Sequence, residues 1–238
     1  MKSVKPNLFF GVPRVWEKLE AVLKSKFVAD PDLTTEGAKE SIGLQECTVF
    51  SYGAAALKYT SVEFFDNLKM PLFNIYGMSE NTGPFVLMSH DKYSLKTTGY
   101  PIPSMDLLID EPDQSGEGEV CMRGRNIMNG YLKNEEATRK AIDLNGFLHT
   151  GDRGRHHPDD FLEITGRIKE LILTSGGENV APVPIEDIFK MECLPCSNVM
   201  VVGEGERFVA ALITFKVVMD PVTGLPTEAL MAEAVTFF

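Results

Sequence analysis

Apolar residues recur at helical spacing near the start of the chain. Between residues 15 and 27 they fall every three or four positions, with charged residues on the opposite side. This spacing predicts an amphipathic helix. Pro13 stands near its start, where a helix tolerates proline. The polar stretch 28–43 is predicted to be a linker.

From residue 48 on, the pattern changes to short apolar runs bounded by turn residues. Residues 48–52 and 71–76 are predicted strands, and residues 61–68 between them are a predicted helix. This order favours an α/β architecture with a partly parallel sheet.

Residues 93–132 show strands alone, at 105–109 and 117–122, separated by a turn-rich segment. This predicts a small antiparallel sheet or a barrel-like subdomain. Asn134 is placed to cap a short helix that runs through Arg139. Further strands are expected at 161–165, 170–173, 198–202 and 208–215, and an apolar terminal helix from Thr227.

Composition narrows the classes of function. The 238 residues carry a formal net charge of −11 and no basic stripe, so we expect no nucleic-acid partner. Four cysteines in a chain of this length do not predict a disulfide framework. No run approaches eighteen apolar residues, so no membrane span is expected. A cytoplasmic location fits best, and peripheral attachment to the endoplasmic reticulum or another membrane stays open.

The first stretch with candidate chemistry is residues 73–83, where a buried strand is predicted to end at Ile75 and is followed by Tyr76 and Gly77. Ligands of open α/β sheets bind at the carboxyl ends of strands. Gly77 would let the backbone approach a phosphate, Ser79 offers a hydroxyl, and Glu80 offers a hard oxygen ligand for Mg²⁺. The alternative is a surface turn after a core strand.

Two later stretches add candidates. Asp152 follows a glycine, and such an aspartate can accept both hydroxyls of a ribose; the alternative is an Asx turn. Arg167 supplies a planar charged fork for phosphate or ribose oxygens. Residues 175–177 form a Ser-Gly-Gly loop whose backbone can approach a ligand closely. A surface ion pair followed by a hairpin turn is the alternative for residues 165–179.

The order and spacing of these stretches carry more information than any one of them. GAAAL (53–57), NIYGMSE (74–80), GEVCMRGRNIMNGYLKNEEAT (118–138), FLHTGD (147–152) and GRIKELILTSGGENVAPVPIE (166–186) resemble successive motifs of the adenylate-forming, AMP-binding superfamily. The last motif is similar to that of long-chain acyl-CoA synthetases, and most similar to the bubblegum branch, as is GVPRVWEKLE (11–20).

The resemblance implies a fold and domain limits. It implies an α/β fold that forms part of an adenylate-forming enzyme, with an α/β sheet layer, a small β-barrel-like subdomain and a partial C-terminal α+β domain. Residues 1–165 would belong to the large AMP-binding domain, with 93–132 as its β-rich subdomain. Residues 166–238 would form the hinge and part of the small C-terminal domain.

The resemblance also implies an activity. Enzymes of this family join a long-chain fatty acid to ATP, form an acyl-adenylate, and transfer the acyl group to coenzyme A. The resemblance implies contacts with ATP and Mg²⁺ at the strand ends. The adenine would lie beside Gly53, Ala54 and Ala55, with Tyr76 against its face. The phosphates would contact Gly77 and Ser79, and Mg²⁺ would bind to Glu80.

In the second half of the chain, Asp152 would bind the ribose hydroxyls and Arg167 the ribose or phosphate. Lys169 matches the hinge position about which the small domain rotates between the half-reactions. The channel for coenzyme A would be faced by Ser175, Gly176 and Gly177. Trp16 is predicted to be a core residue; the alternative is that it forms part of the wall of the fatty-acid tunnel.

Two parts of the family pattern find no match. A phosphate-cradling loop ending in Pro-Lys is not found in residues 1–50, and a lysine near the family's C-terminus finds no counterpart. Since loss of one preorganised donor costs about 3 kcal/mol, we expect little ATP–pyrophosphate exchange from this chain alone. Further chain segments or a partner would then cover its exposed sheet edges.

Three other interpretations compete. The first is a non-catalytic nucleotide-binding remnant or truncated isoform with a regulatory or interaction role. The second is an amino-acid or aryl-acid adenylating domain, which the form of the last motif disfavours. The third is a zinc or redox role for Cys193 and Cys196, weak without a second pair or nearby histidines. His156 and His157 are read as part of a solvated hairpin turn.

Overall fold

The computed structural model describes the whole chain except Leu194, residues 221–225 and residues 236–238. The chain forms two compact units. Unit 1 comprises residues 1–150 and 154–164, and unit 2 comprises residues 151–153 and 165–238.

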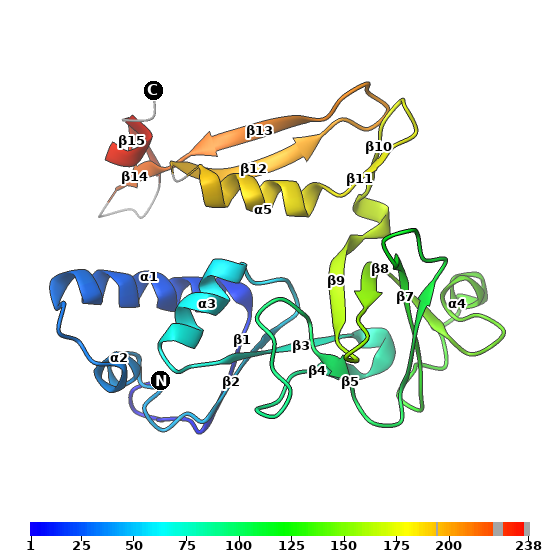
Figure 1. Cartoon of the computed structure of the whole chain (residues 1–238), viewed down its shortest axis with the longest axis horizontal. Coiled ribbons are helices and arrows are strands. Elements are labelled where there is room, and N and C mark those ends of the chain that lie inside the picture. The colour runs from blue at the N-terminus through cyan, green and yellow to red at the C-terminus, as the bar shows by residue number, and fades with distance from the viewer. Residues whose placement is uncertain (194, 221–225, 236–238) are drawn as a thin grey trace. The chain divides into compact units, whose positions relative to one another are not determined.

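A five-stranded sheet in the order β1-β2-β3-β4-β5 forms the frame of unit 1 (Figure 1). Its strands are β1 (Leu8–Gly11), β2 (Val49–Gly53), β3 (Leu72–Met78), β4 (Gly83–Leu87) and β5 (Tyr100–Pro101). The first three run parallel, and β4 and β5 are antiparallel to their neighbours. The predicted partly parallel sheet is therefore confirmed.

Three helices accompany this sheet: α1 (Pro13–Ala29), α2 (Thr35–Ile42) and α3 (Tyr59–Asn67). The predicted helices at 15–27 and 61–68 correspond to α1 and α3. The predicted linker at 28–43 is wrong, because α2 lies within it. Thr34 caps α2 by accepting a hydrogen bond from Gly37 N at 3.1 Å, and Gly43 ends it with φ +80°. This short helix is mostly polar, and only Ala38 and Ile42, four residues apart, are buried on its inner side.

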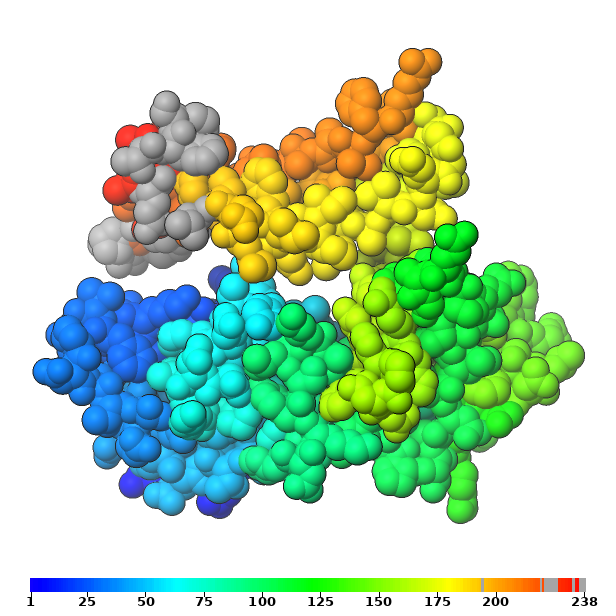
Figure 2. All heavy atoms as spheres, in the orientation of Figure 1, coloured from blue at the N-terminus to red at the C-terminus, as the bar shows by residue number. Residues whose placement is uncertain are grey.

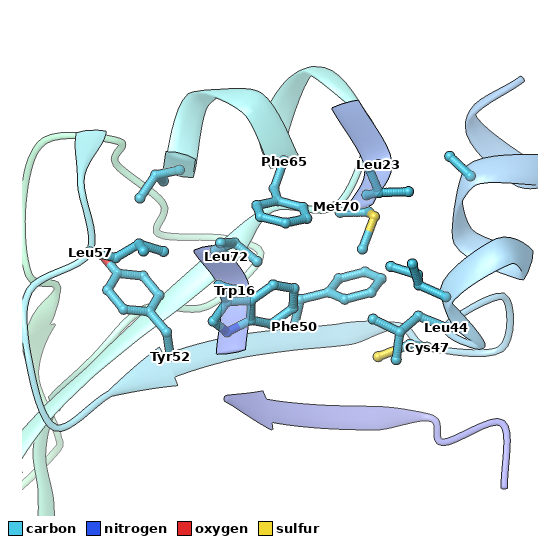
Figure 3. Close-up of a cluster of buried hydrophobic side chains, with 13 residues drawn as sticks. Trp16, Leu23, Leu44, Cys47, Phe50, Tyr52, Leu57, Phe65, Met70 and Leu72 are labelled. Carbon is cyan, nitrogen blue, oxygen red and sulfur yellow. The ribbon is translucent and has the colours of Figure 1, made fainter. Parts of the chain in front are cut away.

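The largest core cluster lies between these helices and the sheet, around Trp16 (Figure 3). The indole is fully buried, and its ring centroid lies 5.0 Å from that of Phe65 and 5.3 Å from that of Phe9. Its Nε1 donates a hydrogen bond of 3.1 Å to the carbonyl of Ser51. Trp16 is therefore a core residue, as the sequence favoured.

The second sheet of unit 1 has the order β6-β7-β8-β9. Its strands are β6 (Asp106–Asp110), β7 (Glu117–Arg123), β8 (Leu148–His156) and β9 (Leu162–Arg167), with α4 (Glu135–Ala141) between β7 and β8. It is an open sheet and not a closed barrel. The cap of α4 is confirmed, because Asn134 Oδ1 accepts a hydrogen bond from Ala137 N at 3.1 Å. In Figure 2, the blue and cyan residues lie on one side of unit 1 and the green residues of this sheet on the other.

Unit 2 consists of hairpins and one longer helix. After a turn of 3₁₀ helix, η2 (Ile168–Glu170), come β10 (Ile172–Leu173), β11 (Asn179–Val180), α5 (Pro182–Glu192), β12 (Cys196–Val202), β13 (Ala210–Phe215), β14 (Val217–Met219), β15 (Pro226–Leu230) and α6 (Ala232–Val235). Each antiparallel pair is local: β10 with β11, β12 with β13, and β14 with β15.

Two features of unit 2 differ from the sequence prediction. The sequence analysis did not predict α5, because Pro182 and Pro184 fall in its first turn, where proline is tolerated but conceals a helix. The helix predicted from Thr227 begins too early, because Thr227 lies in β15 and pairing with β14 overrides the local apolar pattern. A terminal helix is present, but it begins at Ala232, as α6. The end of that predicted helix, residues 236–238, lies outside the described residues.

Among the helices that the structure describes, none combines the length and apolarity needed to cross a bilayer.

Replacing Trp16 with Phe should lower the free energy of unfolding by about 2 kcal/mol, because the Ser51 carbonyl loses its donor and indole volume is lost. Urea unfolding measures this change. Val22→Ala is the matched control, since Val22 is exposed on the same helix; its effect should stay within about 0.5 kcal/mol. An equal loss for the two variants would contradict the role assigned to the indole.

Gly77→Ala should destabilise the junction of β3 and β4 by about 3 kcal/mol, because a Cβ there would lie only 1.8 Å from the Gly83 carbonyl oxygen. Amide hydrogen exchange should accelerate across both strands. Gly166→Ala serves as control, since a Cβ at Gly166 meets no heavy atom within 4 Å. Unchanged exchange at β3 and β4 in Gly77→Ala would show that the junction does not need this close approach.

Candidate nucleotide site

The first group of candidate residues lies at the carboxyl ends of the parallel strands β2 and β3. Gly53, the last residue of β2, is in register with Ile75 of β3. The segments 53–55 and 76–80 therefore span the carboxyl ends of two adjacent strands, at the edge where α/β sheets bind ligands.

Backbone geometry at the end of β2 excludes larger side chains. A Cβ on Gly53 would lie 2.5 Å from the Ile75 carbonyl oxygen, so only glycine permits this close strand pairing. Ala54 adopts a left-handed conformation, with φ +69°, which costs a non-glycine residue about 1–2 kcal/mol. Ala54 and Ala55 are exposed, so this strained turn presents backbone and small methyl groups to a ligand.

Tyr76 and Gly77 lie in β3 beside a register shift opposite β4. The Tyr76 side chain is partly buried and packs against a core cluster that includes Phe85 and Val86. This packing restricts its ring orientation.

Ser79 and Glu80 lie in a turn of 3₁₀ helix, η1 (Ser79–Asn81), which follows β3. Buried Asn81 holds this turn, because its Oδ1 accepts a hydrogen bond of 2.7 Å from Met78 N. The Asn81 carbonyl accepts a bond of 2.8 Å from Asn126 Nδ2, and Thr82 Oγ1 donates to the Asn126 carbonyl at 2.6 Å. The sequence analysis did not identify Asn81 and Asn126, although both lie within or next to the motifs it used.

Glu80 is anchored at both backbone and side chain. Its carbonyl accepts a hydrogen bond from Met128 N at 2.7 Å, and its Oε1 accepts one from the Tyr131 hydroxyl at 2.9 Å. This hydrogen bond raises the pKa of Tyr131, since ionised tyrosine would lose it. Glu80 is half-buried, so a carboxylate of fixed orientation remains accessible to a hard cation. The tyrosine was not singled out from the sequence, although it belongs to the quoted NGYLK segment.

The second group is the ion pair of Asp152 and Arg167 in unit 2. Arg167 Nε lies 3.0 Å from Asp152 Oδ1; the carboxylate side chain is 6% exposed and the guanidinium side chain 62%. A buried carboxylate needs such a partner, and here the pairing also fixes the direction of the guanidinium fork. The pair can offer acceptor oxygens to hydroxyl groups and donor nitrogens to phosphate.

The Asx turn considered for residues 145–152 is made by a different aspartate. Asp143 Oδ1 accepts hydrogen bonds of 2.8 Å from the backbone N–H groups of Asn145 and Phe147. These two bonds, with that of Phe147 first, lower the pKa of Asp143. Asp152 itself lies within strand β8, so it is not the residue that forms the turn.

The segment Ser175–Gly177 forms the exposed turn between β10 and β11. Gly177 N donates to the Thr174 carbonyl at 2.9 Å, and Ser175 N donates to the Glu206 carbonyl at 2.8 Å. Gly177 has φ +82°, which favours glycine. Residues 165–179 therefore contain a residue of an ion pair, Arg167, followed by a hairpin turn, as the alternative interpretation stated. Their contacts with nucleotide and coenzyme A stay predictions. Lys169 is exposed in η2.

Both groups suit a nucleotide chemically. The strand-end loops combine glycine backbone, a hydroxyl and a carboxylate, which are the groups that phosphate and Mg²⁺ require. The structure brings residues 53–55 and 76–80 together in unit 1, and Asp152 and Arg167 together in unit 2.

The other cysteine and histidine motifs are accounted for structurally. Cys193 and Cys196 are free thiols within a small apolar cluster with Val199. Among the described residues, they belong to no group of metal-ligating side chains. His156 and His157 pair with Asp160 at 3.0 Å and Glu163 at 2.9 Å, at the hairpin that joins β8 and β9. Their predicted hairpin is confirmed.

Comparisons with known proteins identify relatives that align with the whole chain. A chicken (Gallus gallus) protein named long-chain-fatty-acid–CoA ligase ACSBG2 is 39% identical over the whole of this chain, which spans 36% of its length. A mouse (Mus musculus) protein named long-chain-fatty-acid–CoA ligase ACSBG1 is 38% identical, again over the whole chain, which spans 38% of its length. The chain thus spans less than half the length of these relatives.

Solved structures show the same fold at low sequence identity. O-succinylbenzoate CoA synthetase (MenE) from Bacillus subtilis, in complex with the acyl-adenylate intermediate OSB-AMP, matches with a TM-score of 0.70 at 21% identity, covering 91% of this chain and 43% of that one. The ATP-bound RpMatB-BxBclM chimera B3 matches with a TM-score of 0.72 at 22% identity, covering 92% and 42%.

The family model described as AMP-binding enzyme matches residues 1–132, which include the β2 and β3 strand ends and the Glu80–Tyr131 contact. Together with the relatives that align over its whole length, this match shows that the chain belongs to the AMP-binding enzyme family.

Proposed function

We propose that this chain supplies the adenine, ribose and magnesium side of the nucleotide site of an ATP-dependent long-chain fatty acid–CoA ligase. The observation that carries the proposal is the alignment of the whole chain, at 38–39% identity, with proteins named as such ligases. ATP, Mg²⁺, a long-chain fatty acid and coenzyme A are the corresponding substrates and metal. Free cysteines and a net charge of −11 support a cytosol-facing location.

The strand-end loops support the roles proposed for their residues. Gly53 to Ala55 form a turn of small residues that presents backbone and methyl groups to an adenine. Tyr76 offers a ring held by core packing. Gly77 and Ser79 offer backbone and hydroxyl to phosphate. Glu80 binds Mg²⁺ in this proposal, since Mg²⁺ commonly takes one or two carboxylates together with substrate phosphates.

The Asp152–Arg167 pair supports the ribose role. A carboxylate held at low exposure can accept strong hydrogen bonds from two hydroxyl groups, because competing water is excluded. Its guanidinium partner is exposed and carries further donors for ribose or phosphate oxygens. In the same proposal Lys169 is the hinge, and Ser175, Gly176 and Gly177 face coenzyme A.

The ribose role is tested by the affinity of the chain for AMP and for a non-hydrolysable acyl-adenylate analogue, measured by calorimetry. Asp152→Asn should weaken both ligands about 10- to 100-fold, because a hydrogen bond to a charged group contributes about 1.5–3 kcal/mol. Asp159→Asn, an exposed carboxylate in the β8–β9 hairpin, is the matched control and should bind like the parent. Equal affinity of Asp152→Asn and the parent chain would reject the assignment.

The metal role of Glu80 makes a separate prediction. Glu80→Gln should remove most of the Mg²⁺-dependent gain in ATP affinity and leave AMP affinity within about 2-fold, because only the phosphate-bound metal loses a ligand. Glu63→Gln on α3 is the control, since that carboxylate pairs with Tyr59 at 3.3 Å as Glu80 does with Tyr131. A full Mg²⁺ response in Glu80→Gln would assign the metal to other ligands.

A non-catalytic nucleotide-binding role is the second candidate, because binding of AMP would need only the strand-end loops and the Asp152–Arg167 pair. Fatty-acid-dependent ATP–pyrophosphate exchange separates the two functions. Binding with no exchange supports the non-catalytic role, and exchange that disappears in Asp152→Asn supports the ligase.

A further inference from the structure

A compact group of metal-ligating side chains lies on the four-stranded sheet of unit 1. Asp110, Glu119, Cys121 and His149 each place one ligand atom so that all four atoms lie within 4.8 Å of one another. Nothing in the nucleotide proposal uses these residues.

Strand pairing explains why they converge. Glu119 and Cys121 are two residues apart on β7, so their side chains project from the same face of the sheet. Asp110 of β6 is directly opposite Glu119 in the antiparallel register, and β8, which carries His149, is the neighbouring strand on the other side of β7. Three adjacent strands therefore bring four ligands to one face.

The distances between these ligand atoms are close to those in a tetrahedral metal site. His149 Nδ1 lies 2.8 Å from Glu119 Oε2 and 3.4 Å from Cys121 Sγ. Zinc bonds of about 2.0–2.3 Å to nitrogen, oxygen and sulfur set ligand atoms about 3–4 Å apart in a tetrahedron. Small movements of side chains that are already adjacent would thus complete such a site.

The negative charge of the group favours the binding of a cation. Asp110 and Glu119 are like charges directly opposite each other in a strand pair, an arrangement that normally destabilises a sheet. Asp143 brings a third carboxylate, with its Oδ2 3.9 Å from His149 Nε2. A bound dication would relieve this repulsion, and Asp143 would orient the imidazole through its other nitrogen.

The cysteine thiol adds selectivity to the charge. Its residue is fully buried, and this burial, together with the nearby carboxylates Glu119, Asp110 and Asp143, raises the pKa of Cys121 to about 12. A thiolate and an imidazole select a zinc-class ion over Mg²⁺, which prefers oxygen ligands.

We propose that Asp110, Glu119, Cys121 and His149 form a binding site for a zinc-class divalent cation, separate from the magnesium site at Glu80, with Asp143 positioning His149. The residues lie on adjacent strands of one sheet, so the bound ion would cross-link β6, β7 and β8.

The direct test is titration of the whole chain with Co²⁺ and Zn²⁺ after treatment with a chelator. We expect one Co²⁺ per chain, with near-ultraviolet thiolate-to-cobalt charge-transfer absorption that Zn²⁺ abolishes and excess Mg²⁺ leaves intact. X-ray absorption at the zinc edge should show one sulfur and otherwise nitrogen or oxygen ligands. No stoichiometric uptake, or a first shell with several sulfurs, overturns the proposal without any variant.

Variants locate the site. Cys121→Ser should abolish the charge-transfer band, Glu119→Gln should weaken Zn²⁺ binding at least 10-fold, and Asp143→Asn should weaken it about 10-fold. Two matched controls should bind like the parent: Cys47→Ser, another buried thiol, and His157→Gln, a histidine paired with Glu163 but with no cysteine. Loss of the band in Cys47→Ser, or its retention in Cys121→Ser, assigns the metal elsewhere and overturns the proposal.

Discussion

The arrangement of unit 1 depends on the burial of one indole. Trp16 projects from α1 into the space between helices and sheet, where it contacts Phe9, Phe50 and Phe65. Its single donor reaches the Ser51 carbonyl, so helix α1 is joined to the middle of β2 by a directional bond as well as by packing. An indole buried without that bond would leave a polar group unsatisfied. The bond therefore favours one position of α1 along β2.

The position of β2 then sets the edge at which candidate site residues emerge. Close backbone pairing at Gly53 and Gly77 leaves no room for side chains, and the chain must leave the sheet through strained or tight turns. Asn81 holds the second of these turns from within it, and Asn126 and Tyr131 hold it by hydrogen bonds from segments distant in sequence. Side chains such as Glu80 are thus oriented before a ligand arrives, which reduces the ordering cost of binding.

Carboxylates in this acidic chain occur in contrasting settings. Asp152 is buried and paired with a permanent cation, so its charge is compensated within the protein. Asp143 is stabilised by backbone N–H groups that close a turn. Asp110 and Glu119 are opposite each other beside a buried thiol, with Glu119 Oε2 2.8 Å from His149 Nδ1. Carboxylates therefore differ in role according to their surroundings. Asp143 forms a turn, whereas ribose recognition by Asp152 and metal binding by Asp110 and Glu119 are proposals.

Local pattern was enough to determine a large part of this protein. The period of apolar residues predicted α1 and α3, alternating short runs predicted the main strands, and ordered motifs identified the family and the candidate residues. These features depend on residues near one another in sequence. Helix α2, which is short and mostly polar, and α5, which has prolines in its first turn, do not follow from the apolar pattern alone.

Only the tertiary structure decided which distant residues meet. The pairing of β14 with β15 placed the first part of a predicted helix in a strand. The Tyr131 hydroxyl reached Glu80 across 51 positions, and three strands assembled Asp110, Glu119, Cys121 and His149. Strand register and side-chain contact between separate segments depend on the packing of the whole unit, and no local spacing encodes them.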